Sequence, residues 1–481
     1  MRLCQFVSCY TILCLGLFVG SAWAQSGPPP QLTGVFPPTI PRVLPSFDPT
    51  GVIETYNLDA PTVTANHPFF ESLGTNGRAC ATCHEPRSAW GVSVASIQQR
   101  FARSRGTDPI FRPNDGATCP NDDVSTLEAK RKAYNLLLTK GLIRVSLPLP
   151  ASRDFKITAI SDPYRCTTLN SNPPVVSVYR RPLPATDMDF LLNCPASNPG
   201  CAPLAIMWDG REASLQSQAT DATLGHAQAS APPTDAELAA IVAFETNIFD
   251  AQVVDFQAGY LAALGATGGP VALAQQEFYQ GINDLLSAGF NPIIFTDYAA
   301  WEDLLSSGKL NRRQASVARG EMVFNTKTFT INGVNGLNLF ASDPLGAVPI
   351  VGTCGTCHDS PNVGHHSKKL ALDIGVPDAS PPAIDISGLP LFTVTCTAAS
   401  PLGAGYRFIV TDLGKAAISG KCEDVGKVKG PILRGLAARA PYFQNGSGAT
   451  LLDVVNFYDL RFAIGFTDQE KADLVAFLQT L

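Results

Sequence analysis

The clearest pattern along the chain is a helical spacing of apolar residues behind a capping signal. Thr234 and Glu237 form a Thr-x-x-Glu capping box, and Leu238, Ile241 and Ile248 follow on one face. This predicts a helix that begins at Thr234. Two more helices are predicted near the C-terminus, one from Thr450 with Leu451, Val454, Val455 and Tyr458 on one face, and one from the Thr467–Glu470 box with Leu474, Phe477, Leu478 and Leu481.

Other stretches have a less regular pattern. Residues 25–50 are rich in Pro and Gly and are expected to form an extended, partly disordered leader. Residues 106–207 are dense in Pro, Asn, Asp and Cys, which predicts long loops with short helices. Residues 250–310 read as mostly helical. Because strand-like alternation is scarce, the chain is predicted to be mostly α with little β.

The N-terminus has the form of a secretory signal peptide. Met1-Arg2 precede an apolar stretch that runs to Gly20, and Ala22-Trp23-Ala24 match a cleavage site. We expect residues 1–24 to be removed, with a retained anchor as the alternative. No later apolar run is long enough to span a bilayer, so no membrane span is expected.

Composition narrows the possible partners. Hydrophobic residues make up 45% of the 481 residues and charged residues 16%, which is typical of a globular protein. The net charge of −6 argues against nucleic acid as a partner, because phosphate binding needs a basic face.

The chain has 13 cysteines. Three lie within residues 1–24, and four belong to two Cys-x-x-Cys-His motifs. The even remainder predicts disulfides in an exported protein, although six cysteines allow many connectivities. Pairing of neighbours along the chain gives Cys119–Cys166, Cys194–Cys201 and Cys396–Cys422.

The two Cys-x-x-Cys-His motifs are the strongest chemical signal. They are Cys80/Cys83/His84 and Cys354/Cys357/His358. In such a motif the two thiols add to the haem vinyl groups and the histidine becomes the proximal iron ligand. A zinc half-site would need a second ligand pair close by, and a redox dithiol would need a βαβ setting. The motifs therefore predict two covalently bound haem c groups, and a chain with over 200 residues per haem favours an enzyme over a simple carrier.

Several further segments make the chain resemble the bacterial di-haem cytochrome c peroxidase and MauG family. They are Trp208-Asp209-Gly210-Arg211 with Leu215 and Gln218-Ala219, and Leu433-Arg434 with Ala440-Pro441-Tyr442-Phe443 and Thr450-Leu451. The resemblance spans roughly residues 66–481. It implies two cytochrome c-like haem domains related by a pseudo-twofold axis, at 51–300 and 301–481. In the family the first haem reacts with hydrogen peroxide and the second stores or relays electrons.

The resemblance assigns roles around the second haem. Trp208 matches the tryptophan that relays electrons between the haems, with an ordinary core tryptophan as the alternative. Tyr458 matches the distal ligand of the second haem, as in MauG, where peroxidases have Met; a packed tyrosine is the alternative. Arg434 matches an arginine that would pair with a propionate, with a surface salt bridge as the alternative.

Around the first haem the chain departs from the family. Gln218 matches a pocket glutamine, but Gln228 stands where the family has the acid–base Glu. His226 could be the distal base or a sixth ligand, with a structural histidine as the alternative. No His occurs between His84 and His226, which predicts an open first haem. Ser177 stands at the position of a calcium-binding Asn, so calcium is only a possible cofactor.

These features predict a periplasmic, peroxidase-type oxidoreductase. Its partners would be hydrogen peroxide and either a small electron-donor protein, such as a cytochrome or cupredoxin, or an organic or protein substrate. One alternative is a di-haem oxygenase or protein-modifying oxidase, because rubber-cleaving members of the broad family also lack the distal Glu. The other is a cytochrome that only transfers electrons, which would have two six-coordinate haems.

Overall fold

A computed structural model describes residues 36–167, 169–192 and 204–481. The predicted signal peptide and the predicted Cys194–Cys201 disulfide lie outside these ranges. Residues 36–481 form one compact unit. Helix makes up 28% of the structure and strand 17%. The mostly α assignment and the division into two haem domains at residue 300 stay predictions. None of the helices in the described ranges is long and apolar enough to cross a membrane.

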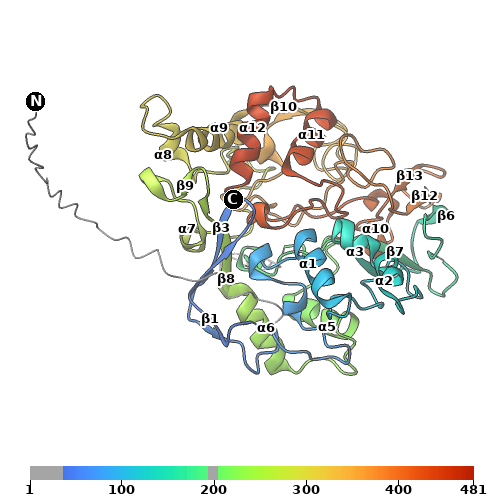
Figure 1. The fold of residues 1–481 in the computed structure, drawn as a ribbon. Coiled ribbons are helices and arrows are strands. Elements are labelled where there is room, and N and C mark those ends of the chain that lie inside the picture. The colour runs from blue at the N-terminus through green and yellow to red at the C-terminus, as the bar shows by residue number, and fades with distance from the viewer. Residues whose placement is uncertain (1–35, 168, 193–203) are drawn as a thin grey trace, which may run out of the picture. The chain divides into compact units, whose positions relative to one another are not determined.

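The helices are mostly short and are spread along the chain (Figure 1). The α-helices of the described ranges are α1 Val94–Ser104, α2 Leu127–Ala133, α3 Asn135–Lys140, α4 Asp189–Leu192, α5 Leu215–Gly225, α6 Asp235–Asn247, α7 Pro270–Gln275, α8 Ala299–Glu302, α9 Arg312–Thr326, α10 Ala416–Ser419, α11 Leu451–Phe462 and α12 Asp468–Leu478. The 3-10 helices are η1 Cys80–Thr82, η2 Pro86–Ser88, η3 Ala263–Gly265, η4 Cys354–Thr356, η5 Cys422–Asp424 and η6 Leu436–Ala438.

The three helices predicted to begin at Thr234, Thr450 and Thr467 are confirmed. Helix α6 begins after Thr234, whose hydroxyl accepts the backbone N–H of Glu237 at 3.3 Å. Helices α11 and α12 begin after Thr450 and Thr467, and each cap closes reciprocally with an acidic side chain three residues later. These caps satisfy N–H groups that the first helical turn leaves without partners, which is why the sequence signal was reliable.

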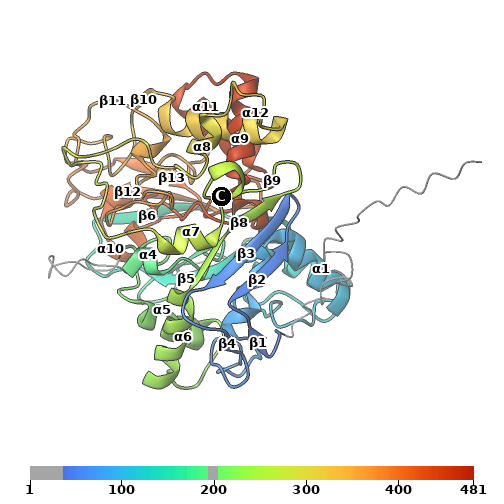
Figure 2. The same ribbon diagram turned by 90° about the vertical axis from the view of Figure 1, so that its left-hand side faces the viewer.

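Strands are more frequent than the sequence pattern suggested. They are β1 Thr39–Ile40, β2 Val43–Phe47, β3 Gly51–Asn57, β4 Thr62–Val63, β5 Ile143–Pro148, β6 Phe155–Ser161, β7 Val175–Arg180, β8 Ile248–Asp255, β9 Gly259–Tyr260, β10 Phe329–Ile331, β11 Ile350–Gly352, β12 Leu391–Cys396 and β13 Arg407–Val410. They pair antiparallel as β2-β3-β8-β9, β13-β12-β6, β5-β7, β10-β11 and β1-β4. Figure 2 shows the β2-β3-β8-β9 sheet on the side facing the viewer.

Three stretches contain strands that the sequence pattern did not predict. The stretch 250–310, expected to be mostly helical, begins with most of strand β8 and contains only the short helices η3, α7 and α8. The buried side chains of β8 include charged and polar residues, so no alternation marked it as a strand. The stretch 106–207 contains strands β5, β6 and β7 as well as short helices. Within the predicted leader 25–50, β1 and β2 are ordered strands paired in sheets.

The C-terminal part has a core built on crossed helices. Helices α9, α11 and α12 lie close together in both views (Figures 1 and 2). The backbones of α9 and α12 touch at Gly320, where a Cβ atom would lie 2.0 Å from the carbonyl oxygen of Asp473. Apolar side chains such as Phe324 and Phe477 fill the surrounding core. A glycine at this crossing lets the two helices approach more closely than side chains would permit.

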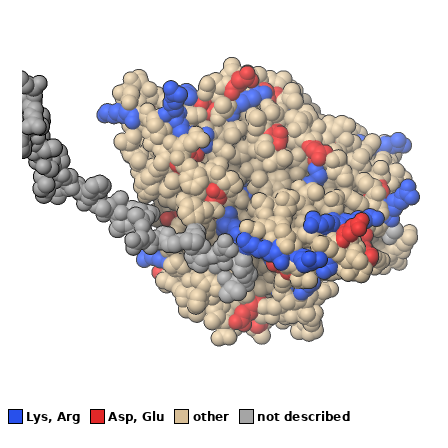
Figure 3. Space-filling view, viewed as in Figure 1, with Lys and Arg blue, Asp and Glu red and all other residues tan. Residues whose placement is uncertain are grey.

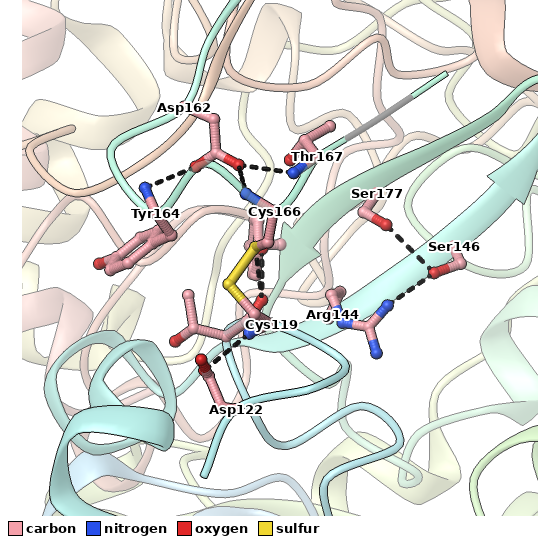
Figure 4. The surroundings of a disulfide bond; sticks show 11 residues. Cys119, Asp122, Arg144, Ser146, Asp162, Tyr164, Cys166, Thr167 and Ser177 are labelled. Atoms are coloured by element: carbon pink, nitrogen blue, oxygen red, sulfur yellow. Dashed lines mark hydrogen bonds between the residues drawn. A yellow bond between two sulfur atoms is a disulfide. The ribbon is translucent and has the colours of Figure 1, made fainter. Parts of the chain in front are cut away.

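Two of the predicted disulfides are confirmed. Cys119–Cys166 and Cys396–Cys422 are both bonded. Around the first of these, the carboxylate of Asp162 accepts the backbone N–H groups of Tyr164, Cys166 and Thr167 (Figure 4). The second lies among the buried residues around β12 and β6, where residues distant in sequence pair. Both bonds therefore fix loops around the sheets rather than the helical core.

Candidate functional site

The two Cys-x-x-Cys-His motifs fold into the same local structure. Each forms a single 3-10 turn, η1 and η4. In each turn the backbone N–H of the histidine donates to the backbone carbonyl of the first cysteine at 3.1 Å. The threonine inside each motif closes the turn: Thr82 Oγ1 accepts the N–H of Ala79, and Thr356 Oγ1 accepts that of Thr353, both at 2.9 Å. The shared threonine thus explains why both motifs adopt one geometry.

Each motif histidine is oriented through its Nδ1 atom. His84 Nδ1 lies 2.7 Å from the carbonyl oxygen of Trp90, and His358 Nδ1 lies 2.6 Å from that of Gly364. A carbonyl can only accept, so Nδ1 carries the proton in both rings and Nε2 keeps its lone pair. Burial lowers the pKa of both histidines, which favours this neutral form. An imidazole with its Nδ1–H fixed on a carbonyl is the arrangement of a metal-ligating histidine.

Each motif opens into a large, mainly apolar cavity. The cavity at the second motif, here called the C-cavity, has about 1660 Å³ of empty space and is lined by Cys354, Cys357 and His358. The cavity at the first motif, the N-cavity, has about 1340 Å³ and is lined by Cys80, Cys83 and His84. Both volumes include open solvent at the cavity mouth. Pro182, Leu183, Pro184 and Lys429 line both cavities and form part of the wall between them.

The four motif thiols suit covalent attachment of a porphyrin. None is bonded in a disulfide, and all four line the cavities. Burial raises the pKa of Cys80, Cys354 and Cys357 to about 12, so these thiols are neutral. A neutral buried thiol is a poor redox dithiol. Within the described ranges no group of three or more His, Cys, Asp or Glu side chains is arranged to hold a metal ion directly. Paired thiols, a fixed imidazole and an apolar cavity together fit haem c at each motif.

Comparison with known proteins agrees with this geometry. A cytochrome-c peroxidase from Denitromonas iodatirespirans, IdrP1, is 32% identical over 143 residues, 27% of this chain and 36% of the relative. IdrP1 from Pseudomonas sp. (strain SCT) is 25% identical over 295 residues, 57% of this chain and 64% of the relative. The chain is thus similar, over part of its length, to curated cytochrome-c peroxidases. The matches span less than two thirds of the length of these relatives, and no family model matches the chain.

Two solved structures are also similar. One is a MauG-like protein associated with microbial copper homeostasis, at 14% identity and a TM-score of 0.38, covering 86% of this chain and 87% of that one. The other is a variant of the diheme peroxidase BthA from Burkholderia thailandensis, at 14% identity and a TM-score of 0.32, covering 92% of this chain and 95% of that one.

The structure brings the predicted residues of the first site together. Gln218, on helix α5, and His226, at the end of that helix, both line the N-cavity with His84. Gln228 is not among the lining residues; its carbonyl accepts hydrogen bonds from Thr75, and its φ is +55°. Gln228, which stands where the resemblance places an acid–base Glu, therefore does not line the cavity that contains His84.

His226 is paired with a carboxylate that the sequence did not single out. Its Nδ1 lies 2.5 Å from Asp115 Oδ2, and Asp115 also forms an ion pair with Arg78. Burial raises the pKa of Asp115, but the hydrogen bond from His226 and the charge of Arg78 outweigh it, so the pKa lies below its usual value. An ionised Asp115 can only accept, so His226 Nδ1 carries a proton and Nε2 is free. About a third of the His226 side chain remains accessible, at 36%.

The predicted residues of the second site also lie around one cavity. Tyr458, on α11, lines the C-cavity, and its ring contacts Phe443, Phe457 and Phe462. Burial and the thiols of Cys357 and Cys354 raise its pKa, so the phenol is neutral without a metal. Trp208 lines the same cavity and is 8% exposed, and its Nε1–H donates to the carbonyl of Arg181 at 2.8 Å. The preceding residues, Ile206 and Met207, line the N-cavity, so this segment runs through the wall between the cavities.

Arg434, expected to pair with a propionate, has a protein partner in the structure, and its propionate contact stays a prediction. Its Nη2 forms a buried ion pair with Asp297 at 2.8 Å, and its Nε donates to the carbonyl of Asn362. Arg434 does not line either cavity. The fold brings the Asp297 carboxylate to Arg434 from a distant part of the sequence. The residues around Arg434 give no sign of this partner.

The calcium prediction is not supported. Ser177 lies on β7, and its Oγ is 3.2 Å from Ser146 Oγ on the paired strand β5 (Figure 4). Arg144 donates to the same Ser146 hydroxyl at 3.1 Å. Calcium sites are built from several carboxylate and carbonyl oxygens, and a positively charged neighbour opposes such a site.

Three buried groups on the cavity walls were missed by sequence reasoning. Asp115 stands in a loop and only the fold brings it to His226. Glu245, on α6, lines the N-cavity; burial raises its pKa to about 8, and its Oε2 has no hydrogen-bond partner in the described structure. Lys429 lines both cavities. The only sequence signal for Lys429 was its position, four residues before the Leu433-Arg434 segment on which the family resemblance rests.

Proposed function

We propose that this chain is a di-haem c-type oxidoreductase that reduces hydrogen peroxide at the His84 site. The observation that carries this proposal is the pairing of His226 with Asp115 in the cavity that also contains His84. An imidazole with one nitrogen fixed on a carboxylate and the other free is an acid–base group. The similarity to cytochrome-c peroxidases supports peroxide as the oxidant.

The chain's own residues would hold the haems at two places. Cys80 and Cys83 would hold the first haem through their thiols, and His84 through Nε2. Cys354, Cys357 and His358 would hold the second in the same way, together with the Tyr458 phenol. A phenolate ligand stabilises ferric and more oxidised iron. When bound, the haems would supply the two electrons, replaced from the electron donor, that together with two protons from solvent convert hydrogen peroxide into two water molecules.

His226 would move the proton that this reduction needs. Its Nε2 accepts a proton from one peroxide oxygen and donates it to the other, which departs as water. Asp115 holds the ring through Nδ1 and stabilises the imidazolium that forms in between. The amide of Gln218 lines the same cavity and orients the peroxide by hydrogen bonding.

Trp208 would couple the two sites. Its indole lines the C-cavity, and the residues just before it line the N-cavity. An oxidisable π-system in the dividing wall allows oxidising equivalents to spread over both irons. The source of reducing equivalents would be a small donor protein or an organic substrate. On the face shown in Figure 3 the charged side chains of both signs are scattered among uncharged ones. We also propose periplasmic export, from the predicted signal peptide.

The test is a stopped-flow reaction of the purified holoprotein with peroxide, followed in the haem absorption bands. We expect His226→Gln to slow the reaction by roughly 10²- to 10⁴-fold and Asp115→Asn by roughly 10- to 100-fold. Gln216→Ala is the matched control, because Gln216 lies on the same helix as Gln218 but is exposed and outside the cavity; it should leave the rate unchanged.

The outcomes separate the alternatives. A rate insensitive to both His226 and Asp115 substitutions would remove His226 as the proton carrier. A stable complex with dioxygen, and product from an organic substrate without added peroxide, would favour the oxygenase alternative. Two six-coordinate haems that bind neither cyanide nor carbon monoxide would favour an electron-transfer cytochrome.

A further inference from the structure

A lysine lies in the wall between the two cavities without an acidic partner. Lys429 is 6% exposed and lines both cavities. Its backbone N–H donates to the carbonyl of Trp208 at 2.9 Å, which fixes it beside the segment that divides the cavities. Within the described ranges its ammonium forms no hydrogen bond or ion pair. Burial, and then the charge of Arg439, lower its pKa to about 8.

Two arginines add to this cationic wall from the side of the C-cavity. Arg181 and Arg439 line the C-cavity but not the N-cavity. Arg181 donates to the carbonyls of Val92 and Arg439 at 2.6 and 2.8 Å, and Arg439 donates to that of Ile432. Neither makes an ion pair within the described ranges. Burial lowers the pKa of Arg181 to about 9 and that of Arg439 to about 10.

Arg180, next to Arg181 in the sequence, shows that burial alone does not leave an arginine without an acidic partner. Arg180 is equally buried, yet it pairs with Asp412 and Asp209. Successive residues at the end of a strand point to opposite sides, so Arg180 turns toward the two carboxylates and Arg181 toward the cavity. The fold thus supplies acids to one arginine and none to the next. Buried cations without a partner are strongly unfavourable, which favours an anion from outside the chain at this wall. Among the three cations only Arg439 is affected by the charge of a nearby carboxylic acid, Asp187, and within the described ranges it forms no ion pair with it.

We propose that Lys429 is a shared anion site that binds propionate carboxylates of both haems, with Arg181 and Arg439 binding those of the second haem alone. This rests on the proposed function, because it takes haem to occupy both cavities. Haem c is the anion that both cavities would bring to this wall, since each macrocycle carries propionates at one edge. Charge-assisted bonds from Lys and Arg to carboxylates are the strong kind of hydrogen bond. The shared lysine would then link the electrostatics of the two irons.

The test is a spectroelectrochemical titration of the holoprotein, with each haem followed through its own absorption or resonance signal. A cation near an iron favours the reduced form, so Lys429→Met should lower the midpoint potentials of both haems. Arg439→Met should lower that of the second haem only. Lys415→Met is the control, because Lys415 is 46% exposed at the side chain and lies outside both cavities; it should shift neither.

A shift confined to one haem in Lys429→Met, or none, overturns the proposal. Lys429→Arg, which keeps the charge, should retain potentials near those of the parent protein. If Lys429→Met and Lys429→Gln lose haem while Lys429→Arg retains it, the charge is needed for cofactor binding and the proposal stands. If all three variants lose haem, Lys429 acts through packing alone and the proposal is refuted. The pyridine haemochrome assay separates failure of this proposal from failure of the proposed function. If the proposed function is wrong because the cavities do not bind haem, the parent protein itself carries no haem.

Discussion

Replacing Arg180 by Met tests how the wall between the cavities is held in place. The guanidinium donates to both oxygens of Asp412, at 2.7 and 2.8 Å, and to Asp209 at 2.5 Å. All three side chains are almost fully buried, with 2%, 1% and 0% of their surfaces exposed. Asp209 follows Trp208 directly, so this triad ties the dividing segment to strand β7 and to the loop after β13.

The expected loss follows from what the substitution leaves behind. Removing one partner of a buried ion pair costs about 3–5 kcal/mol, because it strands an uncompensated charge. Asp209 would keep contacts with Arg211 at 3.1 and 3.2 Å, and Asp412 would keep the N–H of Gly414 at 2.8 Å. These remaining partners limit the damage, so we expect Arg180→Met to lower the free energy of unfolding by about 3–5 kcal/mol rather than to abolish folding.

Arg319 offers a matched comparison. It binds Asp473 through the same two-pronged geometry, at 2.8 and 2.9 Å, but 41% of its side chain is exposed. Asp473 is itself buried, at 3%, but it would keep hydrogen bonds from Ser316 and Gln469, and the lost charge of Arg319 is partly in solvent. Arg319→Met should therefore cost less than Arg180→Met. Urea unfolding followed by far-ultraviolet circular dichroism measures both variants at pH 7. Equal losses in the two variants would refute the argument from burial.

The pH dependence gives a second, independent signature. Burial raises the pKa of Asp209, but Arg180 and Arg211 outweigh it and leave the pKa lowered. A carboxyl with a lowered pKa stabilises the fold above its unfolded pKa, and this stability is lost as the pH falls through the folded value. In Arg180→Met the main cause of the lowering is gone and burial remains. In the parent protein, protonation of Asp209 at low pH reduces the free energy of unfolding. In Arg180→Met this contribution to the pH dependence should disappear.

Three further predictions concern the cavities. Replacing Cys354 and Cys357 together by Ser should reduce the covalent haem content by half, as measured by the pyridine haemochrome assay, since the other motif keeps its own pair. Tyr458→Phe should change the absorption spectrum of one haem and leave the peroxide-reactive one intact; changes in both would contradict separate sites. The pKa of Glu245 is raised to about 8 by burial, so its contribution to stability is complete below its unfolded pKa near 4.5 and is lost as the pH rises through about 8. Glu245→Gln should therefore reduce the fall in melting temperature between pH 5 and pH 9.

Local signals were the part of this molecule that could be predicted from the sequence. A Thr-x-x-Glu box satisfies its hydrogen bonds within four residues, so the start of α6 needed no knowledge of the fold. The same holds for the two haem-type motifs, whose turns close through their own threonines. The disulfides Cys119–Cys166 and Cys396–Cys422 also followed from pairing of neighbours along the chain.

Features made by long-range contacts could not be read in this way. Strand β6 pairs with β12 across more than two hundred residues, and β3 pairs with β8 at a similar distance. Asp115 and His226 meet only because helix α5 ends beside the loop that contains Asp115. The ion pair between Arg434 and Asp297 could not be predicted either, because the two residues lie far apart in sequence.

Under the proposed function, the wall between the cavities would couple the two sites. Its residues come from three separate segments, at 182–184, 206–208 and 429–432. The Trp208 indole N–H donates a hydrogen bond to the backbone carbonyl of Arg181, a buried cation. The backbone carbonyl of Trp208 accepts one from the backbone N–H of Lys429, a second buried cation. A buried indole between unpaired cations is hard to oxidise, because the radical cation would be repelled. Propionates bound to those cations would cancel this repulsion, so the coupling of the two irons through Trp208 should depend on both cavities being filled.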